Sequence, residues 1–210
     1  MDISVFLGAP GSGKGTQAKR LSQEQKFIHL STGDMLRAAI TAGSELGKKA
    51  KGFIDRGDLV PDSVMIELIE NTLSELTPSS RVILDGFPRT VAQAEALDKN
   101  PRTMVKKALY FSIPETVLVE RLTGRRICSK CGEPFHVKFM PPKRDGICDK
   151  CGGSLLQRSD DLEDVVKRRL VVFQQSNQQL LDYYKGSSRL NEFNANQGVD
   201  SIQNNLLSML

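Results

Sequence analysis

The 210-residue sequence contains no tryptophan, and aromatic residues make up only 6% of it. Single-stranded nucleic acids are held largely by bases stacking on aromatic side chains, so this composition gives little support to such a partner. Long hydrophobic runs are also lacking. The most apolar stretch, residues 105–113, has the length of a strand and contains Lys106 and Lys107, whereas a membrane-spanning helix needs about 20 apolar residues. We therefore expect neither a nucleic-acid nor a membrane partner.

The sequence also lacks a strong charge of either sign and a secretory signal. The formal net charge is +4 and the isoelectric point about 8.9, which fits anionic ligands but is too weak to indicate nucleic acid. Asp2 follows the first methionine directly, and the basic start and apolar stretch of a signal peptide are missing. We expect a cytoplasmic protein with reduced thiols.

Apolar periodicity predicts strands that alternate with helices along most of the chain. Strands are expected at residues 3–7, 27–30, 81–85, 107–112 and 190–193. Helices are expected at residues 16–25, 33–42, 44–56, 62–76, 90–97, 114–123, 162–184 and from 199 onward. Asp62, after Pro61, is the expected cap of one of these helices. This alternation predicts an α/β fold with a five-stranded parallel sheet covered on both faces.

A glycine-rich segment, GAPGSGKGT at residues 8–16, joins the first strand to the first helix. Glycines let the backbone turn tightly, so that several N–H groups point at one place. The helix N-terminus adds a partial positive charge there and Lys14 a full one. The general phosphate-loop pattern has Ser or Thr directly after the lysine, whereas here Gly15 precedes Thr16. We still interpret the segment as a phosphate-binding loop rather than a turn without a ligand.

Several further segments carry a family resemblance. They are STGDMLR at 31–37, GDLVPD at 57–62, DGFPRT at 85–90 with Gln93 one turn later, GRR at 124–126, RSDD at 158–161, and Arg169. Together with the phosphate loop they closely resemble adenylate kinases, in the long-lid bacterial form with a zinc-binding lid. The resemblance spans nearly the whole chain, and it accounts for Gly15, because this family has GKGT in its loop.

The resemblance implies an architecture and a reaction. The core, of the P-loop NTPase type, would comprise residues 1–30, 61–123 and 162–210, with a helical nucleoside-monophosphate-binding (NMP-binding) domain at 31–60 and a lid domain at 124–161. The reaction would be reversible, Mg²⁺-dependent transfer of a phosphoryl group, ATP + AMP = 2 ADP. The expected partners are therefore ATP, AMP and ADP, and a monomer is expected from the family alone.

The resemblance also assigns residues to each nucleotide. ATP would be bound by Gly11, Ser12, Gly13, Lys14, Gly15, Thr16, Arg125, Phe135 and Gln197. AMP would be bound by Thr32, Arg37, Asp58, Leu59, Val60, Gly86, Phe87, Pro88, Arg89, Gln93, Arg158 and Arg169. The catalytic residues would be Lys14, Arg89, Arg125, Arg158 and Arg169. Phosphoryl transfer needs positioning and positive charge, which these residues supply, and Asp85 would help to place Mg²⁺ through water.

Some residues have two interpretations in the sequence. Asp160 and Asp161 are either the cap of the following helix or, as the resemblance implies, residues of the lid hinge that pair with lid or ATP groups. Arg121 is either a solvated helix residue or a phosphate ligand, because spacing alone does not fix the phase of its helix. His29 and His136 are expected to be structural rather than acid–base catalysts.

All four cysteines lie in the expected lid, with the spacing C-x2-C-x16-C-x2-C: Cys128, Cys131, Cys148 and Cys151. This spacing is typical of a structural Zn²⁺ ribbon. The alternatives are two disulfides, free thiols or a redox pair, and a cytoplasmic location disfavours disulfides. The choice between zinc and iron stays open, because tetrahedral thiolates accept both.

Three other functions compete with an adenylate kinase. The first is a kinase for UMP or CMP, against which Thr32, Gln93 and the long lid favour adenine by resemblance. The second is a nucleic-acid-binding protein with a zinc ribbon and an ATPase core, whose basic stripe is missing. The third is a GTPase, but the sequence has no Asn-Lys-x-Asp segment to recognise guanine.

Overall fold

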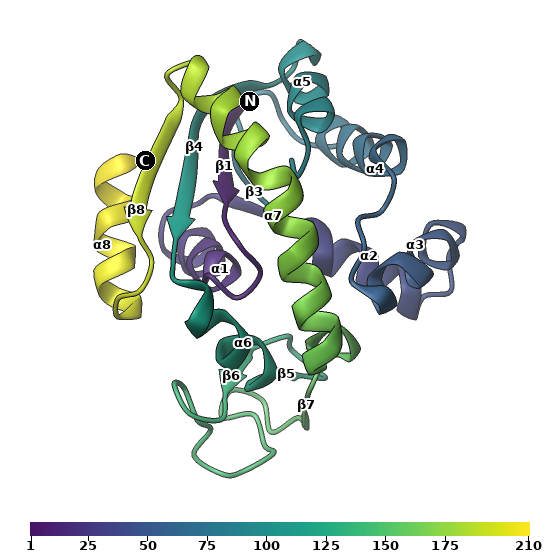
Figure 1. Cartoon of the computed structure of the whole chain (residues 1–210), viewed down its shortest axis with the longest axis vertical. Coiled ribbons are helices and arrows are strands. Elements are labelled where there is room, and N and C mark those ends of the chain that lie inside the picture. The colour runs from purple at the N-terminus through teal and green to yellow at the C-terminus, as the bar shows by residue number, and fades with distance from the viewer.

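Five parallel strands form the central sheet of the protein, whose computed structural model describes residues 1–210 (Figure 1). The strands are β1 (Asp2–Leu7), β2 (Ile28–Ser31), β3 (Arg81–Asp85), β4 (Met104–Ser112) and β8 (Leu190–Asn194). Their order is β2-β3-β1-β4-β8, and every neighbouring pair is parallel. The predicted α/β fold with a five-stranded parallel sheet is confirmed.

The helices lie where periodicity predicts them, within a few residues. They are α1 (Lys14–Glu24), α2 (Thr32–Thr41), α3 (Glu45–Arg56), α4 (Asp62–Ser74), α5 (Val91–Lys99), α6 (Glu115–Thr123), α7 (Glu163–Gly186) and α8 (Val199–Met209). A 3-10 turn, η1 (Ser159–Asp161), precedes α7. None of these helices combines the length and the apolar composition that a membrane span requires.

Alternating side chains of the strands build one core on each face of the sheet. Ile3 and Val5 of β1 pack with α4, α5 and α7 on one face. Phe6 packs with α1 and α8 on the other. Residues at odd and even positions of a strand point to opposite faces, so the six residues of β1 contribute to both cores. The result is a three-layer structure in which helices cover both faces of the sheet.

Two segments project from the carboxyl ends of the strands. Helices α2 and α3 lie to one side, and the segment between α6 and α7 lies at the far end of the molecule (Figure 1). This last segment contains a small antiparallel sheet of β5 (Arg125–Cys128), β6 (Pro134–His136) and β7 (Leu155–Leu156), in the order β6-β5-β7. These strands are too short to show a period of two, so the sequence did not predict them.

Two local expectations were wrong. Strand β4 begins at Met104 rather than at residue 107, because Lys106 and Lys107 interrupt the apolar pattern while the backbone still pairs with β1. Asp62 does not cap α4. The cap position is Pro61, without a side-chain hydrogen bond, and the Asp62 carboxylate instead accepts hydrogen bonds from Thr90 and Gln93.

Gly47 sets how closely α3 packs on α2. A Cβ atom at this position would lie 2.2 Å from the Ala39 carbonyl oxygen, far inside van der Waals contact. Gly52, in the same helix, offers a matched contrast, since a Cβ there would meet only the flexible end of Arg56, at 3.3 Å. Of these two glycines, only Gly47 is needed for the close approach of α3 to α2.

Gly47→Ala is expected to lower the free energy of unfolding by about 1–3 kcal/mol, the usual cost of overpacking. Gly52→Ala should raise it by about 0.5–1 kcal/mol, because alanine favours a helix more than glycine does. Urea denaturation of both variants measures the difference. Equal stability of the two variants would contradict the packing of α3 on α2 described above.

Candidate active site and metal centre

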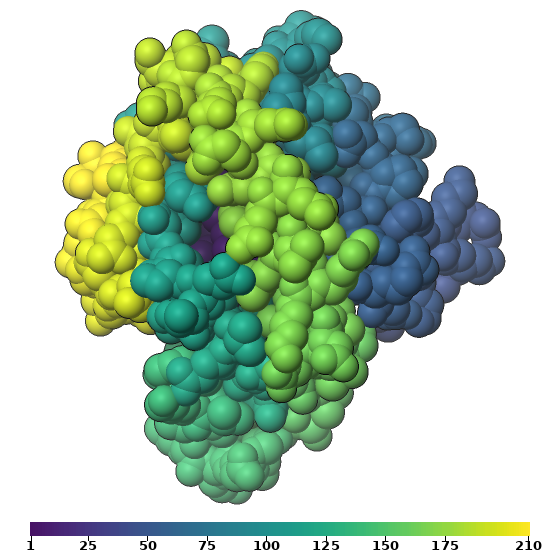
Figure 2. Space-filling model, viewed as in Figure 1, coloured from purple at the N-terminus to yellow at the C-terminus, as the bar shows by residue number.

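A cleft of about 930 Å³ opens at the carboxyl edge of the sheet. Leu7, Ser31 and Asp85, the last residues of β1, β2 and β3, lie in its wall. Figure 2 shows a hollow between α7 and the β4–α6 part of the chain, with atoms of the N-terminal segment at its floor. Open α/β sheets bind ligands outside the carboxyl ends of their strands, so this cleft is the candidate active site.

The phosphate loop turns from β1 into α1 through residues that need left-handed backbone. Gly11 has φ 83° and Gly13, the cap residue of α1, has φ 98°. No side chain caps α1, and its first turn contains no acidic residue. The helix cannot satisfy the N–H groups of its own first turn, so these groups are available to an anion, as the sequence predicts.

Lys14 folds back over this loop. Its Nζ donates to the carbonyl oxygens of Gly8 at 2.6 Å and Ala9 at 2.8 Å, and to Ser12 Oγ at 3.2 Å. Burial lowers the pKa of Lys14 to about 8, although the charge of Asp85 opposes the shift. Removal from water disfavours the charged ammonium. An anion in the loop would restore its ordinary pKa.

Asp85 stands opposite the lysine, at the end of β3. Burial alone would raise its pKa, but the nearby His29 ring and the charge of Lys14 hold the pKa below its ordinary value. The two side chains approach to 3.5 Å between His29 Nε2 and Asp85 Oδ2. A Cβ at Gly15 would lie 3.2 Å from Asp85 Oδ2. This crowding gives a physical reason for glycine, rather than Ser or Thr, after the lysine.

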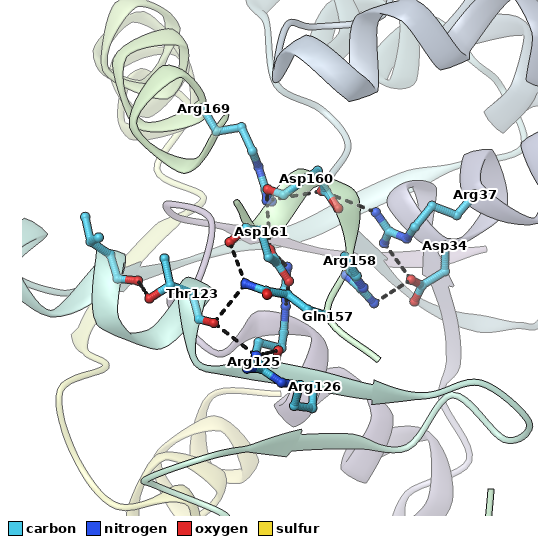
Figure 3. Close-up of polar contacts among 11 residues, drawn as sticks. Asp34, Arg37, Thr123, Arg125, Arg126, Gln157, Arg158, Asp160, Asp161 and Arg169 are labelled. Carbon is cyan, nitrogen blue, oxygen red and sulfur yellow. Dashed lines mark hydrogen bonds and ion pairs between the residues drawn. The ribbon is translucent and has the colours of Figure 1, made fainter. Parts of the chain in front are cut away.

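Arginines and aspartates interlock across the cleft from the phosphate loop (Figure 3). Arg125 forms a two-point contact with Asp161, from Nε to Oδ2 at 2.8 Å and from Nη2 to Oδ1 at 2.5 Å. Arg169 Nη1 donates to the Asp160 carbonyl oxygen at 2.7 Å and lies 3.2 Å from Asp161 Oδ1. Asp161 has 0% exposed side-chain surface. This buried carboxylate therefore holds two arginines in place.

A second set of contacts joins α2 to the turn before α7. Asp34 Oδ1 accepts from Arg37 Nη2 at 2.6 Å and from Arg158 Nη2 at 3.1 Å. Arg37 also lies 3.7 Å from the Asp160 carboxylate. Asp34 lines the cleft, and sequence reasoning did not assign it a role, although it stands inside the quoted STGDMLR segment. The sequence feature that could have identified Asp34 is a carboxylate between Thr32 and Arg37, two residues expected to bind AMP.

Asp160 and Asp161 are not the cap of the long helix. The cap position of α7 is Leu162, without a side-chain hydrogen bond, and the two aspartates form η1 before it. Burial would raise the pKa of Asp160, but the charges of Arg169 and Arg37 hold it below its ordinary value. Of the two interpretations, the structure supports pairing with arginines at the base of the α6–α7 segment.

Burial and repulsion between neighbouring guanidinium groups lower the pKa values of two arginines in the cleft. The pKa of Arg158 is lowered to about 10 by burial and then by the charges of Arg37 and Arg125. The pKa of Arg89 is likewise lowered to about 10, by enclosure within the cleft and then by Arg169. The Arg89 guanidinium has no carboxylate partner and donates only to the Gly86 carbonyl oxygen at 2.9 Å. Both side chains remain cationic at neutral pH, and of the two only Arg158 has a carboxylate partner, Asp34.

Most residues expected at AMP line the cleft. They are Thr32, Arg37, Asp58, Leu59, Val60, Gly86, Pro88, Arg89, Gln93, Arg158 and Arg169. Phe87 differs, because its side chain is 1% exposed and packs in the core beneath α4 and α5. A contact between the Phe87 side chain and a nucleotide is therefore not supported. The Asp58 carboxylate is engaged by Arg56 and Arg168.

All the residues expected at ATP line the cleft: Gly11, Ser12, Gly13, Lys14, Gly15, Thr16, Arg125, Phe135 and Gln197. Phe135 is 8% exposed and packs against Cys128 and Cys148, so it belongs partly to the core of its own segment. Arg121 also faces the cleft. Ser176 and Asn177 of α7 line the cleft as well, and no sequence signal marked them among the many polar residues of that helix.

The four cysteines lie together between the two Cys-x-x-Cys turns, which we call knuckles. Their Sγ atoms all lie within 4.8 Å of one another. The nearest pairs join different knuckles, Cys128–Cys151 at 3.4 Å and Cys131–Cys148 at 3.7 Å. A disulfide requires about 2.05 Å, so the cysteines are unlinked. Four thiolates around an ion at about 2.3 Å would lie about 3.8 Å apart, which the observed spacing fits.

The first Cys-x-x-Cys turn favours a thiolate at Cys128, whereas the neighbouring sulfurs raise the pKa of Cys151 in the second. Backbone N–H groups of Cys131 and Lys130 face the Cys128 sulfur and lower the pKa of that thiol to about 6. A Cβ on Gly153 would lie 2.9 Å from the same sulfur, so the second knuckle needs glycine to close on the first. His136 is directed away, toward the Glu120 carbonyl oxygen at 3.1 Å. The donor set is four sulfurs.

Comparison with known proteins gives one consistent family. The adenylate kinase family matches residues 6–189. An adenylate kinase of Thermodesulfovibrio yellowstonii is 47% identical over 209 residues, which is 98% of this chain and 97% of the relative. One of Caldicellulosiruptor bescii is 49% identical over 189 residues, 89% and 88% of the two chains. One of Archaeoglobus fulgidus is 44% identical over 209 residues, 98% and 96%.

Cys128→Ser is expected to abolish binding of a metal ion and to lower the melting temperature by about 5 °C or more, because metal binding supplies folding energy to a small segment. Metal analysis and thermal denaturation of the purified protein measure both effects. Ser129→Ala, an exposed neighbour in the same knuckle, is the control and should keep metal and stability. Unchanged metal content in Cys128→Ser would refute the four-sulfur site.

Proposed function

Because the chain belongs to the adenylate kinase family, we propose that the cleft at the carboxyl edge of the sheet is where it transfers a phosphoryl group from ATP to AMP. The reaction, ATP + AMP = 2 ADP, is that of the family, and the chain is a nucleoside monophosphate kinase. The convergence of Lys14 and six arginines on one cleft is the observation that carries the placement. Transfer between two phosphate groups requires such a concentration of positive charge.

ATP would bind with its phosphates on the N–H groups of residues 11–16, beneath Lys14, with Arg125 and Phe135 above them. AMP would bind on the side of Thr32, residues 58–60 and Gln93, with its phosphate near Arg37 and Arg89. Arg158 and Arg169 lie between the two sides. Arginine offers two parallel hydrogen bonds to a phosphate, so these residues can hold both reactants in line while charge builds on the transferring group.

The three domains follow from this placement. Residues 31–60 would close over AMP and residues 124–161 over ATP, while the remaining core holds the sheet. Closure excludes water, which would otherwise accept the phosphoryl group. The contact of Asp34 with Arg158 joins the two moving segments directly, and Lys19 of α1 reaches Glu133 of the lid at 2.9 Å. These contacts support a lid that closes against both the core and the NMP-binding segment.

Mg²⁺ would accompany ATP, and Asp85 fits its placement. Its side chain is 14% exposed and stands in the cleft wall beside Lys14 and Gly15. Carboxylate oxygens suit Mg²⁺, which keeps much of its water shell, so Asp85 would act through water. The ion would neutralise negative charge on the phosphates, and Asp85 would hold the ion in position.

The four cysteines would hold a structural Zn²⁺. The four-sulfur set leaves no open position, so the ion would stiffen the lid and take no part in the transfer. Zinc is proposed over iron from the ribbon-like spacing. A cytoplasmic location, a monomeric state and the lack of a membrane partner remain expectations. The lack of a nucleic-acid partner is also an expectation, which the modest charge and low aromatic content favour.

Lys14→Met is expected to lower kcat by at least about 100-fold, since it removes a charge aimed at the transferring phosphate. The melting temperature should stay unchanged or rise, because the variant no longer keeps a charged ammonium in the loop. Steady-state ADP formation and thermal denaturation measure the two effects. Lys167→Met, on the exposed side of α7, is the control. Near-normal turnover of a folded Lys14→Met would refute the role of the loop.

ATP binding should also take up protons near pH 8. Half of the Lys14 side chains are neutral where the pH equals the pKa of about 8, and phosphate oxygens raise that pKa, so binding should take up roughly half a proton at pH 8 and almost none at pH 6.5. Calorimetry in buffers of different ionisation enthalpy measures the uptake. Lys14→Met should abolish it, and equal uptake in both proteins would contradict the assignment to Lys14.

A further inference from the structure

The Gln93 side chain sits at the end of a hydrogen-bond chain that begins on another helix. Gln93 is 2% exposed and lines the cleft. Its Nε2 donates to Asp62 Oδ1 at 2.7 Å, and its Oε1 accepts from the Arg89 backbone N–H at 2.8 Å. The other Asp62 oxygen accepts from Thr90 Oγ1 at 2.9 Å. Both carboxylate oxygens of Asp62 are therefore engaged.

These partners permit only one orientation of the Gln93 amide. A carboxylate can only accept hydrogen bonds and a backbone N–H can only donate. Turning the amide by 180° would place its oxygen against Asp62 and its NH₂ group against the Arg89 N–H. Two hydrogen bonds would then become two repulsive contacts. The orientation is fixed by the chemistry of its neighbours rather than by packing, and one N–H and one lone pair of the amide stay free.

The fixed orientation matters because an unconstrained amide does not discriminate between purines. A 6-aminopurine offers an N–H donor beside a ring-nitrogen acceptor, and an amide pairs with that edge through its oxygen and its N–H. A 6-oxopurine offers the reverse order, acceptor beside donor, and the amide turned by 180° pairs with it equally well. A site with fixed hydrogen-bonding groups rejects the wrong partner strongly, because polar groups are left unpaired.

We propose that Asp62 is a specificity-determining positioning residue, which fixes the amide of Gln93 so that the AMP side of the cleft accepts a 6-aminopurine and rejects a 6-oxopurine. The inference rests on the proposed function, in which Gln93 faces the base of AMP. Asp62 touches no nucleotide in this account and acts only through Gln93. Thr90 supports it by holding the second oxygen of the carboxylate.

Asp62→Asn tests the proposal with almost no change in shape. An asparagine can accept from Gln93 or, when turned, donate to it, so both orientations of Gln93 find a partner at residue 62 and only the Arg89 N–H still opposes the turned one. The ratio of kcat/KM for AMP to kcat/KM for IMP, which differs from AMP in the 6-oxo edge of its base, should fall by about ten-fold. The fall should arise mainly through KM. Glu67→Gln, an exposed loss of one charge on the same helix, should keep the ratio.

A second pair of variants covers the case in which Asp62→Asn does not fold. Thr90→Val removes the hydroxyl that holds Asp62 and should lower the ratio in the same direction by a smaller factor, while Thr90→Ser should restore it. Equal loss of activity with AMP and IMP would show that Asp62 merely braces α4 against α5 and would overturn the inference. Wild-type protein that does not turn over AMP would overturn the proposed function as well, and this is measured first.

Discussion

Repulsion between the cationic side chains of the cleft is the interaction that the rest of the structure must balance. The cationic side chains that share the cleft are Lys14, Lys19, Arg37, Arg89, Arg121, Arg125, Arg158 and Arg169. Aspartates balance some of this charge, foremost the fully buried Asp161. The pKa values of Lys14 and Arg89 are lowered first by burial and further by neighbouring arginines, so the balance of charge is incomplete. Phosphate groups would supply the missing negative charge, so the protein alone is less stable at this site than the protein with its nucleotides.

The fold brings these charges together from distant parts of the chain. Parallel strands end at one edge of the sheet, which places the phosphate loop after β1 beside Asp85 after β3. Helix α7 carries Arg169 back across the cleft, and α2 carries Arg37 to meet it through Asp160. Helices α2 and α7 thus each contribute a cation whose charged partners are aspartates. In the proposed function, closure over nucleotides and neutralisation of charge would be one event.

The sequence predicted the sheet, the helices and the residues of the phosphate loop, because glycine-rich turns and buried strands are local features. The grouping of the four cysteines was also predicted, because ligand spacing within a short segment constrains their geometry. The sequence did not predict which way individual side chains point. Phe87 lies in a motif associated with AMP but faces the core, and Asp62 proved to be a partner of Gln93 rather than a helix cap. These outcomes depend on packing between helices far apart in sequence, which periodicity does not encode.

The most direct test of the account is product analysis with purified protein, ATP, Mg²⁺ and one nucleoside monophosphate at a time. A cleft that joins two nucleotides through shared arginines predicts that each AMP consumed gives two ADP, without release of inorganic phosphate. UMP and CMP should react far more slowly. Slow release of inorganic phosphate at the same rate with every monophosphate, or with none, would contradict the account, because the cations would then serve hydrolysis at a single nucleotide.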